Sequence, residues 1–325
     1  MSSLVICCDW GTTALRVSLC DSDTGNVLHV LRSPLGVLAC NQQFLSSGQS
    51  PQHRKSYFID ILKNTIEQFP ETWGSLSKIP VVVSGMASAA IGMEPLPYAE
   101  LPFSVEGSNA VVKKWNEEDR EWVLISGLKA ELDIIRGEET QLVGAVKKFP
   151  HSSENSLLIF PGTHSKHVWV KSGKAVSFKT YMTGEVFCFM FSNSILAASV
   201  QENDMSDPKL HAAFRKGVRL GAEENIMHVM FRVRANGLFN KGTKEENFAL
   251  LSGMLIGSEL KELFGIETDS IVVCGSQDMR MAYEEALREL NLLNDKVFHS
   301  IAAEEATALG QIGIYKWSGL INFDL

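Results

Sequence analysis

Two segments of the chain, Leu4–Val17 and Leu157–Val168, repeat one pattern about 150 residues apart, a period much longer than that of solenoid repeats. In each segment a short apolar run, which predicts a buried strand, ends at a Gly-Thr pair that begins at Gly11 or Gly162. A valine follows each glycine after six residues, within a second run of alternating apolar and polar residues. This internal duplication predicts two similar domains that face each other across a cleft.

The rest of the chain alternates between strand and helix patterns, which predicts an α/β fold with mixed sheets and flanking helices. A length of 325 residues fits two domains of about 150 residues each. We expect the first domain at 1–135 and the second at 136–325, with a final helix at 303–320 that can pack back on the first. The other expected helices are 58–69, 138–145, 211–235, 248–264 and 278–290, and the expected strands are 4–8, 15–19, 27–31, 80–85, 122–125, 157–160, 168–170, 176–180, 271–274 and 297–301.

Composition excludes several classes of protein. Hydrophobic residues make up 45% of the chain and charged residues 21%, as in ordinary globular proteins, so disorder is not expected. The formal net charge is −8 without a basic cluster, which argues against nucleic-acid binding through phosphate neutralisation. The longest apolar stretch, Ala249–Ile256, is too short to span a membrane, and no signal peptide is recognised. The six cysteines include no C-x-x-C pair, so we expect reduced thiols, no structural zinc and a cytoplasmic location.

The first Gly-Thr turn, in the segment Asp9–Thr13, has the residue types of a phosphate site. Gly11 lets a ligand approach the backbone, and the N–H groups from Gly11 through Thr12 to Thr13 can form a nest for an anion. The two threonine hydroxyls can add further donors. Asp9 lies at the end of the preceding strand, where its carboxylate is placed to hold Mg²⁺ through water.

The second turn, in the segment Pro161–His167, repeats this design with a lysine nearby. Lys166 is a compact cation suited to phosphate, and His164 can also donate to phosphate. A single turn of this kind often binds nothing, but two such turns in duplicated domains favour a shared ligand. We therefore expect the pair to grip the β- and γ-phosphates of one nucleotide. The contacting residues expected in the second turn are Gly162, Thr163, His164 and Ser165.

Six segments in a fixed order extend the pattern over nearly the whole chain. They are DWGTT with Arg16, SGMAS (84–88), RGEETQLVGA (136–145), PGTHSKHV (161–168), MTGE (182–185) and LSGMLIGSEL (251–260). Together they resemble the 2-dehydro-3-deoxygalactonokinase family of the actin/sugar kinase/heat-shock-70 ATPase superfamily. The resemblance implies two ribonuclease H-like domains around an ATP cleft, in the actin-like ATPase fold. It also implies that ATP, with Mg²⁺, phosphorylates the 6-hydroxyl of 2-dehydro-3-deoxy-D-galactonate in D-galactonate breakdown.

The same resemblance bears on the proton acceptor. Related carbohydrate kinases carry a Gly-Asp whose carboxylate is the base, and here Gly137 precedes Glu138 and Glu139 at the start of an expected helix. Either glutamate could take this role, and both could instead only favour the N-terminus of the helix. The expected catalytic residues are Asp9, Glu138, Glu139 and Lys166.

Contacts with the sugar acid and with adenosine also follow from the resemblance. Arg136 has the planar fork that suits a substrate carboxylate, although a salt bridge between elements would explain it as well. Gly275 and Ser276 resemble the adenosine motif, in which a strand ends against the purine. Many family members carry an Arg-Gln pair in the segment Ala87–Phe103, which has neither residue here, so Ser88 or Tyr98 would replace them or the substrate would differ. The expected substrate-binding residues are Trp10, which could wall the sugar pocket, Arg16, Gly85, Met86, Ser88, Tyr98 and Arg136.

Alternatives to this function stay open. The substrate could be another 2-keto-3-deoxy sugar acid, the chain could be a nucleotide-binding regulator, or water could replace the sugar in a phosphohydrolase. A homodimer is compatible with the sequence. Among single residues, we expect His167 on a sheet surface, Gly253 and Gly257 at a close helix contact, and Asp278 as a helix cap.

Overall fold

A computed structural model describes residues 3–203 and 207–320 of the chain. These residues form two compact units. Unit 1 contains the described parts of 1–155, 168–178 and 301–325, and unit 2 contains 156–167 with the described parts of 179–300. Within the two described ranges, none of the helices combines the length and apolar character that a membrane crossing requires.

Unit 1 is built on a six-stranded mixed sheet. Its strand order is β3 (Val27–Ser33), β2 (Leu15–Asp21), β1 (Leu4–Trp10), β4 (Val81–Gly85), β8 (Arg120–Ile125) and β7 (Val112–Glu117). The first three strands form an antiparallel meander, whereas β4 pairs in parallel with both β1 and β8. The pairing places Asp9 opposite Arg16, and Trp10 opposite Gly85. The α/β class with mixed sheets is therefore confirmed.

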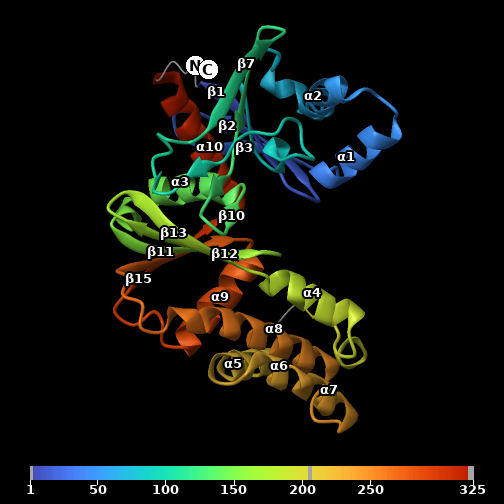
Figure 1. Ribbon diagram of the computed structural model, residues 1–325, viewed down its shortest axis with the longest axis vertical. Helices are drawn as coiled ribbons and strands as arrows, with labels where there is room; N and C mark the ends of the chain where they lie inside the picture. Colours follow the sequence, from blue (N-terminus) through green and yellow to red (C-terminus); the bar gives the residue numbers. More distant parts are fainter. Residues whose placement is uncertain (1–2, 204–206, 321–325) are drawn as a thin grey trace. The chain divides into compact units, whose positions relative to one another are not determined.

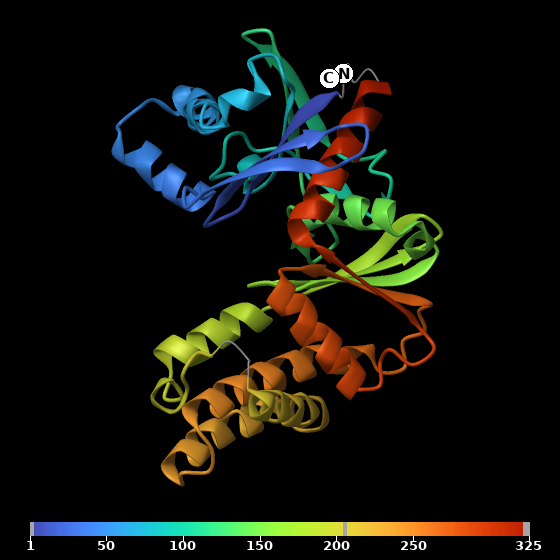
Figure 2. The ribbon, with the colours of Figure 1, turned by 180° about the vertical axis from the view of Figure 1, so that it is seen from behind.

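Helices cover both faces of this sheet, as Figures 1 and 2 show from opposite sides. α1 (Val37–Ser46) and α2 (Arg54–Ile66) lie over one face, and α10 (Ala303–Leu320) lies over the other. The alternation of side chains along a strand explains this layering, because successive residues of β1 face opposite sides. Cys8 faces α2 in the hydrophobic core, whereas the Cys7 sulfur lies 4.0 Å from the carbonyl oxygen of a residue on α10.

A close crossing joins α10 to α3 (Glu138–Lys148). A Cβ added at Gly144 of α3 would overlap the carbonyl oxygen of Ala306 on α10. Conversely, a Cβ added at Gly310 of α10 would overlap the carbonyl oxygen of Thr140 on α3. The two glycines let the backbones touch, so α10 fixes the position of the helix that begins with the two candidate bases.

Short elements complete unit 1 around the segment expected to be mostly loop. The strands β10 (Ile134–Ile135), β9 (Leu128–Lys129) and β5 (Ala99–Glu100) form a small sheet in that order. Short 3-10 turns cover Pro51–His53, Glu71–Trp73, Met86–Ser88 and Pro150–Ser153. β6 (Phe103–Ser104) pairs antiparallel with the start of β13 (Lys174–Tyr181), Ser104 lying opposite Lys174. The 3-10 turn Met86–Ser88 follows β4 directly in the chain.

Unit 2 repeats the strand pattern of unit 1. Its strands belong to a sheet with the order β15 (Val297–Ala302), β14 (Ser270–Gly275), β11 (Asn155–Phe160), β12 (Ser165–Lys171), β13 and β6. β11 pairs in parallel with β14, as β1 pairs with β4 in unit 1. The second Gly-Thr turn joins β11 to β12 just as the first joins β1 to β2. The expected duplication is thus visible in the order of the strands.

Most of the remaining unit 2 residues are helical. Its helices are α4 (Thr183–Asn193), α5 (Pro208–Glu223), α6 (Ile226–Val229), α7 (Phe231–Leu238), α8 (Lys244–Leu260) and α9 (Gln277–Glu289), with 3-10 turns at Ala197–Ser199 and Lys261–Leu263. Figure 1 shows α5 lying along α8. Added Cβ atoms at Gly253 and Gly257 of α8 would overlap carbonyl oxygens of α5, which confirms the close helix contact expected for this pair.

The helical character expected around 211–235 is confirmed, although the segment divides into α5, α6 and α7 because Glu224 is extended and the Asn225 side chain caps α6. Two other local expectations for unit 2 are wrong. Asp278 does not cap α9, since the Ser276 hydroxyl accepts the hydrogen bond from the Met279 N–H and Asp278 lies inside the helix. His167 is fully buried rather than on a sheet surface.

Candidate functional site

The first Gly-Thr turn is held by the start of α1. The N–H of Val37 donates to the carbonyl oxygen of Gly11 over 3.0 Å, and the N–H of Leu38 donates to that of Thr12 over 3.1 Å. A Cβ added at Gly36 would overlap the Thr12 carbonyl oxygen, so only glycine lets the helix approach the turn this closely. With its carbonyls tied to α1 and its threonines exposed, the turn presents the hydroxyls of Thr12 and Thr13 to solvent.

The second turn is held by α4 in the same way. The N–H of Glu185 donates to the carbonyl oxygen of Thr163 over 2.9 Å. A Cβ added at Gly184 would overlap the carbonyl oxygen of Gly162. Gly162, Thr163 and His164 are exposed at the tip of the turn. Each Gly-Thr turn is therefore shaped by a glycine at the N-terminus of the helix that follows the third strand of its own copy.

Asp9 lies beside the first turn and binds Arg16. The Nη1 group of Arg16 lies 2.9 Å from Oδ2 of Asp9, across the β1–β2 pairing. Arg16 also approaches Glu304, whose Oε1 lies 3.7 Å from its Nε, and Glu304 accepts from Arg32 over 2.8 Å. Burial raises the pKa of the Asp9 carboxyl, and the charge of Arg16 limits that rise. The ion pair thus holds the Asp9 carboxylate next to the Arg16 guanidinium near the end of β1.

The two candidate bases differ in exposure. Gly137 precedes α3 with φ +107°, a conformation that favours glycine. Glu139 is 1% exposed, and its carboxylate accepts from the Gly137 N–H over 2.7 Å and from the Thr140 hydroxyl over 2.9 Å. Burial, with a smaller effect of the nearby Glu138 charge, raises the pKa of Glu139 to about 8. Glu138 is partly exposed and accepts from the Arg136 N–H over 3.0 Å. The geometry therefore leaves Glu138 as the glutamate that a ligand can reach.

Four of the expected substrate residues meet in unit 1. The Nη1 group of Arg136 donates to the Ser88 hydroxyl over 2.6 Å, and its guanidinium lies 4.4 Å from the centre of the Tyr98 ring. The Ser88 hydroxyl donates in turn to the carbonyl oxygen of Gly85 over 3.3 Å. Gly85 has φ +86°, and a Cβ there would crowd the Trp10 carbonyl oxygen. Residues far apart in the chain thus form one polar cluster at the carboxyl end of β4.

Trp10 lies in the core rather than at the surface of this cluster. Its side chain is fully buried, and its indole N–H donates to the carbonyl oxygen of Leu35 over 2.9 Å. The ring packs against Phe58, with 5.1 Å between the ring centres. In this structure the Trp10 side chain supports β1 from the α2 side and has no exposed surface for a ligand. Met86 is partly exposed next to the polar cluster.

Beyond the tip of the second turn, the chain points inward. The side chains of Ser165, Lys166 and His167 are all buried. The Lys166 ammonium donates to the carbonyl oxygen of His164 over 2.7 Å, and the exposed His164 ring lies 2.7 Å from the Glu185 carboxylate. The Ser165 hydroxyl donates into the interior of unit 2, so only its backbone belongs to the surface of the turn.

The acceptor for Ser165 is Glu259 of α8, a residue that the sequence analysis did not single out. Its carboxylate also contacts His167, Thr183 and Tyr283. One signal was present in the sequence, because Glu259 is the acidic residue in the otherwise apolar or small segment Leu251–Leu260. A carboxylate within such a helix is buried only with partners.

The expected adenosine motif follows the strand beside β11. β14 ends at Gly275, which is buried, and the exposed Ser276 begins α9 as its N-cap. A Cβ at Gly275 would be in ordinary contact with Pro161, at the start of the second turn. The motif and the second turn therefore lie on adjacent strand ends of unit 2.

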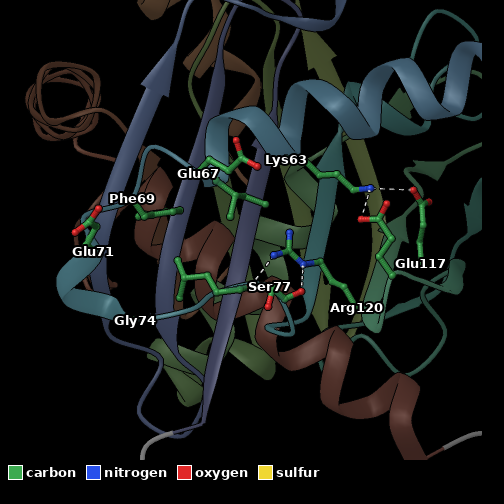
Figure 3. Close-up of a pocket in the computed structure, with 11 residues that line it drawn as sticks. Lys63, Glu67, Phe69, Glu71, Gly74, Ser77, Glu117 and Arg120 are labelled. Carbon is green, nitrogen blue, oxygen red and sulfur yellow. Dashed lines mark hydrogen bonds and ion pairs between the residues drawn. The ribbon is translucent and has the colours of Figure 1, made fainter.

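A pocket of about 340 Å³ opens elsewhere on unit 1, and none of the expected site residues lines it (Figure 3). Lys63 reaches Glu117 and Glu118 across its rim. The buried Arg120 donates to the carbonyl oxygens of Leu76 and Ser77. These contacts join the β7–β8 hairpin to α2 and to the chain that follows it, and no residue of either Gly-Thr turn lines the pocket.

Comparison with known proteins agrees with this arrangement. The family model described as 2-keto-3-deoxy-galactonokinase matches residues 9–313. The 2-dehydro-3-deoxygalactonokinase of Escherichia coli (strain K12) is 29% identical over 298 residues, which are 89% of this chain and 91% of that protein. A Rhizobium meliloti (strain 1021) protein provisionally given the same name is 29% identical over 310 residues, 93% of each chain. A Sinorhizobium meliloti crystal structure, also provisionally so named, has a TM-score of 0.77 at 27% identity and covers 99% of this chain and 97% of its own. The resemblance noted in the sequence is confirmed: the chain belongs to the 2-keto-3-deoxy-galactonokinase family.

Proposed function

We propose that the protein is a sugar-acid kinase that transfers the γ-phosphate of ATP to the 6-hydroxyl of 2-dehydro-3-deoxy-D-galactonate. Membership of the family supports this activity, as do relatives of that name that match almost the full length of the chain. The observation that carries the proposal is the matched anchoring of two Gly-Thr turns. The carbonyl oxygens of Gly11 and Thr163 each accept a hydrogen bond from the start of the next helix, so both turns are held by the same kind of contact.

ATP binding would use both turns and the start of α9. The amides and hydroxyls of Thr12 and Thr13 would bind phosphate oxygens from unit 1, while Gly11, whose N–H donates to the carbonyl oxygen of Ala14 over 2.9 Å, would shape the turn rather than supply an amide. Gly162, Thr163 and His164 would do so from unit 2, with Lys166 adding charge and the Ser165 backbone an amide. Gly275 and Ser276 would contact the adenosine. Exposure of both turn tips supports this assignment.

A divalent metal, which we propose to be Mg²⁺, suits this site. The described residues contain no group of three or more His, Cys, Asp or Glu side chains that could hold a metal on their own. Mg²⁺ in phosphoryl-transfer sites keeps several waters and uses one or two carboxylates with the phosphates. The single carboxylate of Asp9 is therefore enough to hold it. When bound, the metal would neutralise charge on the phosphates, and Arg16 would orient the Asp9 carboxylate through its 2.9 Å contact.

For the proton acceptor, we assign the role to Glu138. A base must come within hydrogen-bond reach of the hydroxyl that it deprotonates, and Glu138 is partly exposed whereas Glu139 is buried. Glu139 would hold the turn before α3, because it accepts the Gly137 N–H. In the reaction the sugar oxygen would form a bond to the γ-phosphorus as the bond from that phosphorus to the β,γ-bridging oxygen breaks, ADP would leave, and the hydroxyl proton would move to Glu138.

The carboxylate of the sugar acid would bind Arg136. Its guanidinium is already oriented by the Ser88 hydroxyl and the Tyr98 ring. This orientation lowers the entropic cost of ordering the side chain when the ligand binds. Gly85 and Met86 would form the adjacent wall. In this proposal Ser88 and Tyr98 take the place of the Arg-Gln pair that many family members carry in Ala87–Phe103.

We further propose that units 1 and 2 correspond to the two expected ribonuclease H-like domains. The strand orders of both units support this correspondence. The cytoplasmic location and the homodimer remain predictions from the sequence.

The test is an assay of ADP release with a panel of 2-keto-3-deoxy sugar acids. We expect turnover to depend on sugar and to be fastest with 2-dehydro-3-deoxygalactonate, and product analysis to find phosphate on the 6-hydroxyl. Faster turnover with another sugar acid would reassign the substrate. ADP release at the same rate without sugar would identify a phosphohydrolase instead and refute the kinase proposal.

A further inference from the structure

A buried carboxylate in unit 2 gathers donors from three other elements. Glu259, on α8, is 3% exposed. It accepts from the Ser165 hydroxyl of β12 over 2.7 Å and from the Tyr283 hydroxyl of α9 over 2.9 Å. The His167 ring nitrogen Nε2 lies 2.8 Å from the same carboxylate, and the Thr183 hydroxyl donates to it from α4. One side chain thus connects four elements of the same unit.

These hydrogen bonds stabilise the ionised form of Glu259. Burial on its own would raise the pKa of the carboxyl, but the hydrogen bond and charge of His167, with the hydroxyls of Thr183 and Ser165, lower it below its usual value. A buried carboxylate that lost these donors would be left with the cost of its desolvation. The ionised group therefore holds its donors in place, and the donors hold the carboxylate.

Two of the donors lie on elements that adjoin the second Gly-Thr turn. Ser165 is the residue at which the chain leaves the turn and enters β12. Thr183 is the first residue of α4, directly before Gly184 and Glu185, which contact Gly162 and Thr163. Glu259 therefore fixes both the strand that leaves the turn and the helix that supports it.

We propose that Glu259 is a positioning residue for ATP, which sets the shape of the second turn by holding Ser165 and Thr183 at once. Glu259 is itself too deeply buried to touch a nucleotide, so it acts through the turn. The inference rests on the proposed function, in which this turn binds ATP phosphates. The inference goes beyond the proposed function in one specific claim. A hydrogen-bond network in the interior of unit 2 controls the affinity for ATP and leaves the affinity for the sugar acid unchanged.

Two variants test the network at different points. Glu259→Gln keeps the size of the side chain but removes its charge. Thr183→Val removes the hydroxyl with which α4 donates to Glu259 and leaves Glu259 itself unchanged. Thr183→Ser keeps the hydroxyl and serves as the conservative rescue. Ser270→Ala is the control for stability, because it removes a buried 2.9 Å hydrogen bond between Ser270 and Ser156 near the start of β14 and β11.

The readouts are the Kd of a non-hydrolysable ATP analogue by calorimetry, KM for each substrate, kcat, and the midpoint of thermal unfolding. Loss of one hydrogen bond to a charged group corresponds to about a tenfold change in an equilibrium constant. We expect Glu259→Gln and Thr183→Val to raise the Kd of the analogue and the KM for ATP by about this factor. The KM for the sugar acid should stay near the wild-type value, and Thr183→Ser and Ser270→Ala should bind the analogue like wild type.

Two failures can be told apart. If the wild type binds the analogue and both variants bind it equally well despite a lower unfolding midpoint, Glu259 has only a structural role and the inference is overturned. If the wild type does not bind the analogue, the proposed function fails and the inference falls with it. Should Glu259→Gln fail to fold, Thr183→Val decides alone, because it leaves the buried carboxylate and its other donors in place.

Discussion

The guanidinium of Arg136 donates a 2.6 Å hydrogen bond to the hydroxyl of Ser88, 48 positions earlier in the chain. Arg136 leads into α3, and Ser88 lies just after β4, so the contact links the segment before the candidate base to the end of a central strand. The Tyr98 ring stacks on the same guanidinium at 4.4 Å. An arginine held from two sides in this way is prepared for a carboxylate ligand.

Arg136→Lys should weaken binding of the sugar acid selectively. Lysine keeps the charge but loses the planar fork, and it cannot both donate to Ser88 and bind a carboxylate with two parallel hydrogen bonds. We expect the KM for the sugar acid to rise about ten- to a hundredfold, with the KM for ATP unchanged, in steady-state assays. An equal rise in both KM values would instead indicate that Arg136 supports the fold of the site in general.

Substitutions of the two glutamates of α3 should differ in their effect on kcat. Glu138→Gln removes the exposed carboxylate, and we expect kcat to fall by about 10²-fold or more, the usual contribution of a general base. Glu139→Gln changes a buried group that already accepts two hydrogen bonds, and kcat should fall much less. The opposite ranking would identify Glu139 as the base, and two active variants would place the base elsewhere.

The pKa of Glu139 predicts a pH dependence of stability. Because burial raises this pKa to about 8, the folded protein keeps the proton where the unfolded chain, with an ordinary pKa of 4.5, has released it. Between these values the folded state binds more protons, so this group makes the free energy of unfolding fall as the pH rises. Glu139→Gln should flatten that slope in denaturant titrations at several pH values. A slope equal to that of the wild type would contradict the raised pKa.

The sequence predicted the strands better than the helices that hold the turns between them. The apolar runs before Gly11 and Gly162 identify β1 and β11 directly, since a short buried strand is a local signal. The helices α1 and α4 were missed, and both begin without a side-chain cap. α4 reads TGEVFCFMFSN, whose consecutive apolar residues give no helical period. The two Gly-Thr turns could therefore be found from the sequence, but not what holds them.

Long-range contacts explain the other omissions. Glu259 binds residues that lie 76 and 94 positions earlier in the chain, and no local pattern joins them. The choice between Glu138 and Glu139 depends on the burial of Glu139, which is also a tertiary effect. Residue type and spacing suggested both Glu138 and Glu139 as bases, whereas their different burial distinguishes them.

Asp9→Asn should remove phosphotransfer without unfolding the protein. Asparagine can still accept from Arg16 but has no charge with which to hold a metal. We expect kcat to fall by at least about 10²-fold and the apparent affinity for Mg²⁺ to decrease in titrations of activity. The matched control is Glu304→Gln, which breaks the exposed pairs with Arg16 and Arg32 and should stay within about fivefold of wild type, since such pairs contribute little. An Asp9→Asn enzyme within a few-fold of wild type would refute the metal role.

Gly36→Ala and Gly184→Ala test whether the matched anchoring of the two turns matters for ATP. In each case the new methyl group would overlap a carbonyl oxygen of the supported turn, of Thr12 in unit 1 and of Gly162 in unit 2. The helix or the turn must shift, and the amides of the turn then lose their aim at a phosphate. We expect each variant to raise the Kd of a non-hydrolysable ATP analogue about tenfold or more, with a smaller effect on the sugar acid. Gly319→Ala is the control, because no atom lies within 4 Å of the added Cβ, and the exposed site should accept alanine without loss. If only one of the two turn variants loses affinity, the phosphates bind one turn, and the duplicated turn has kept its geometry without its ligand.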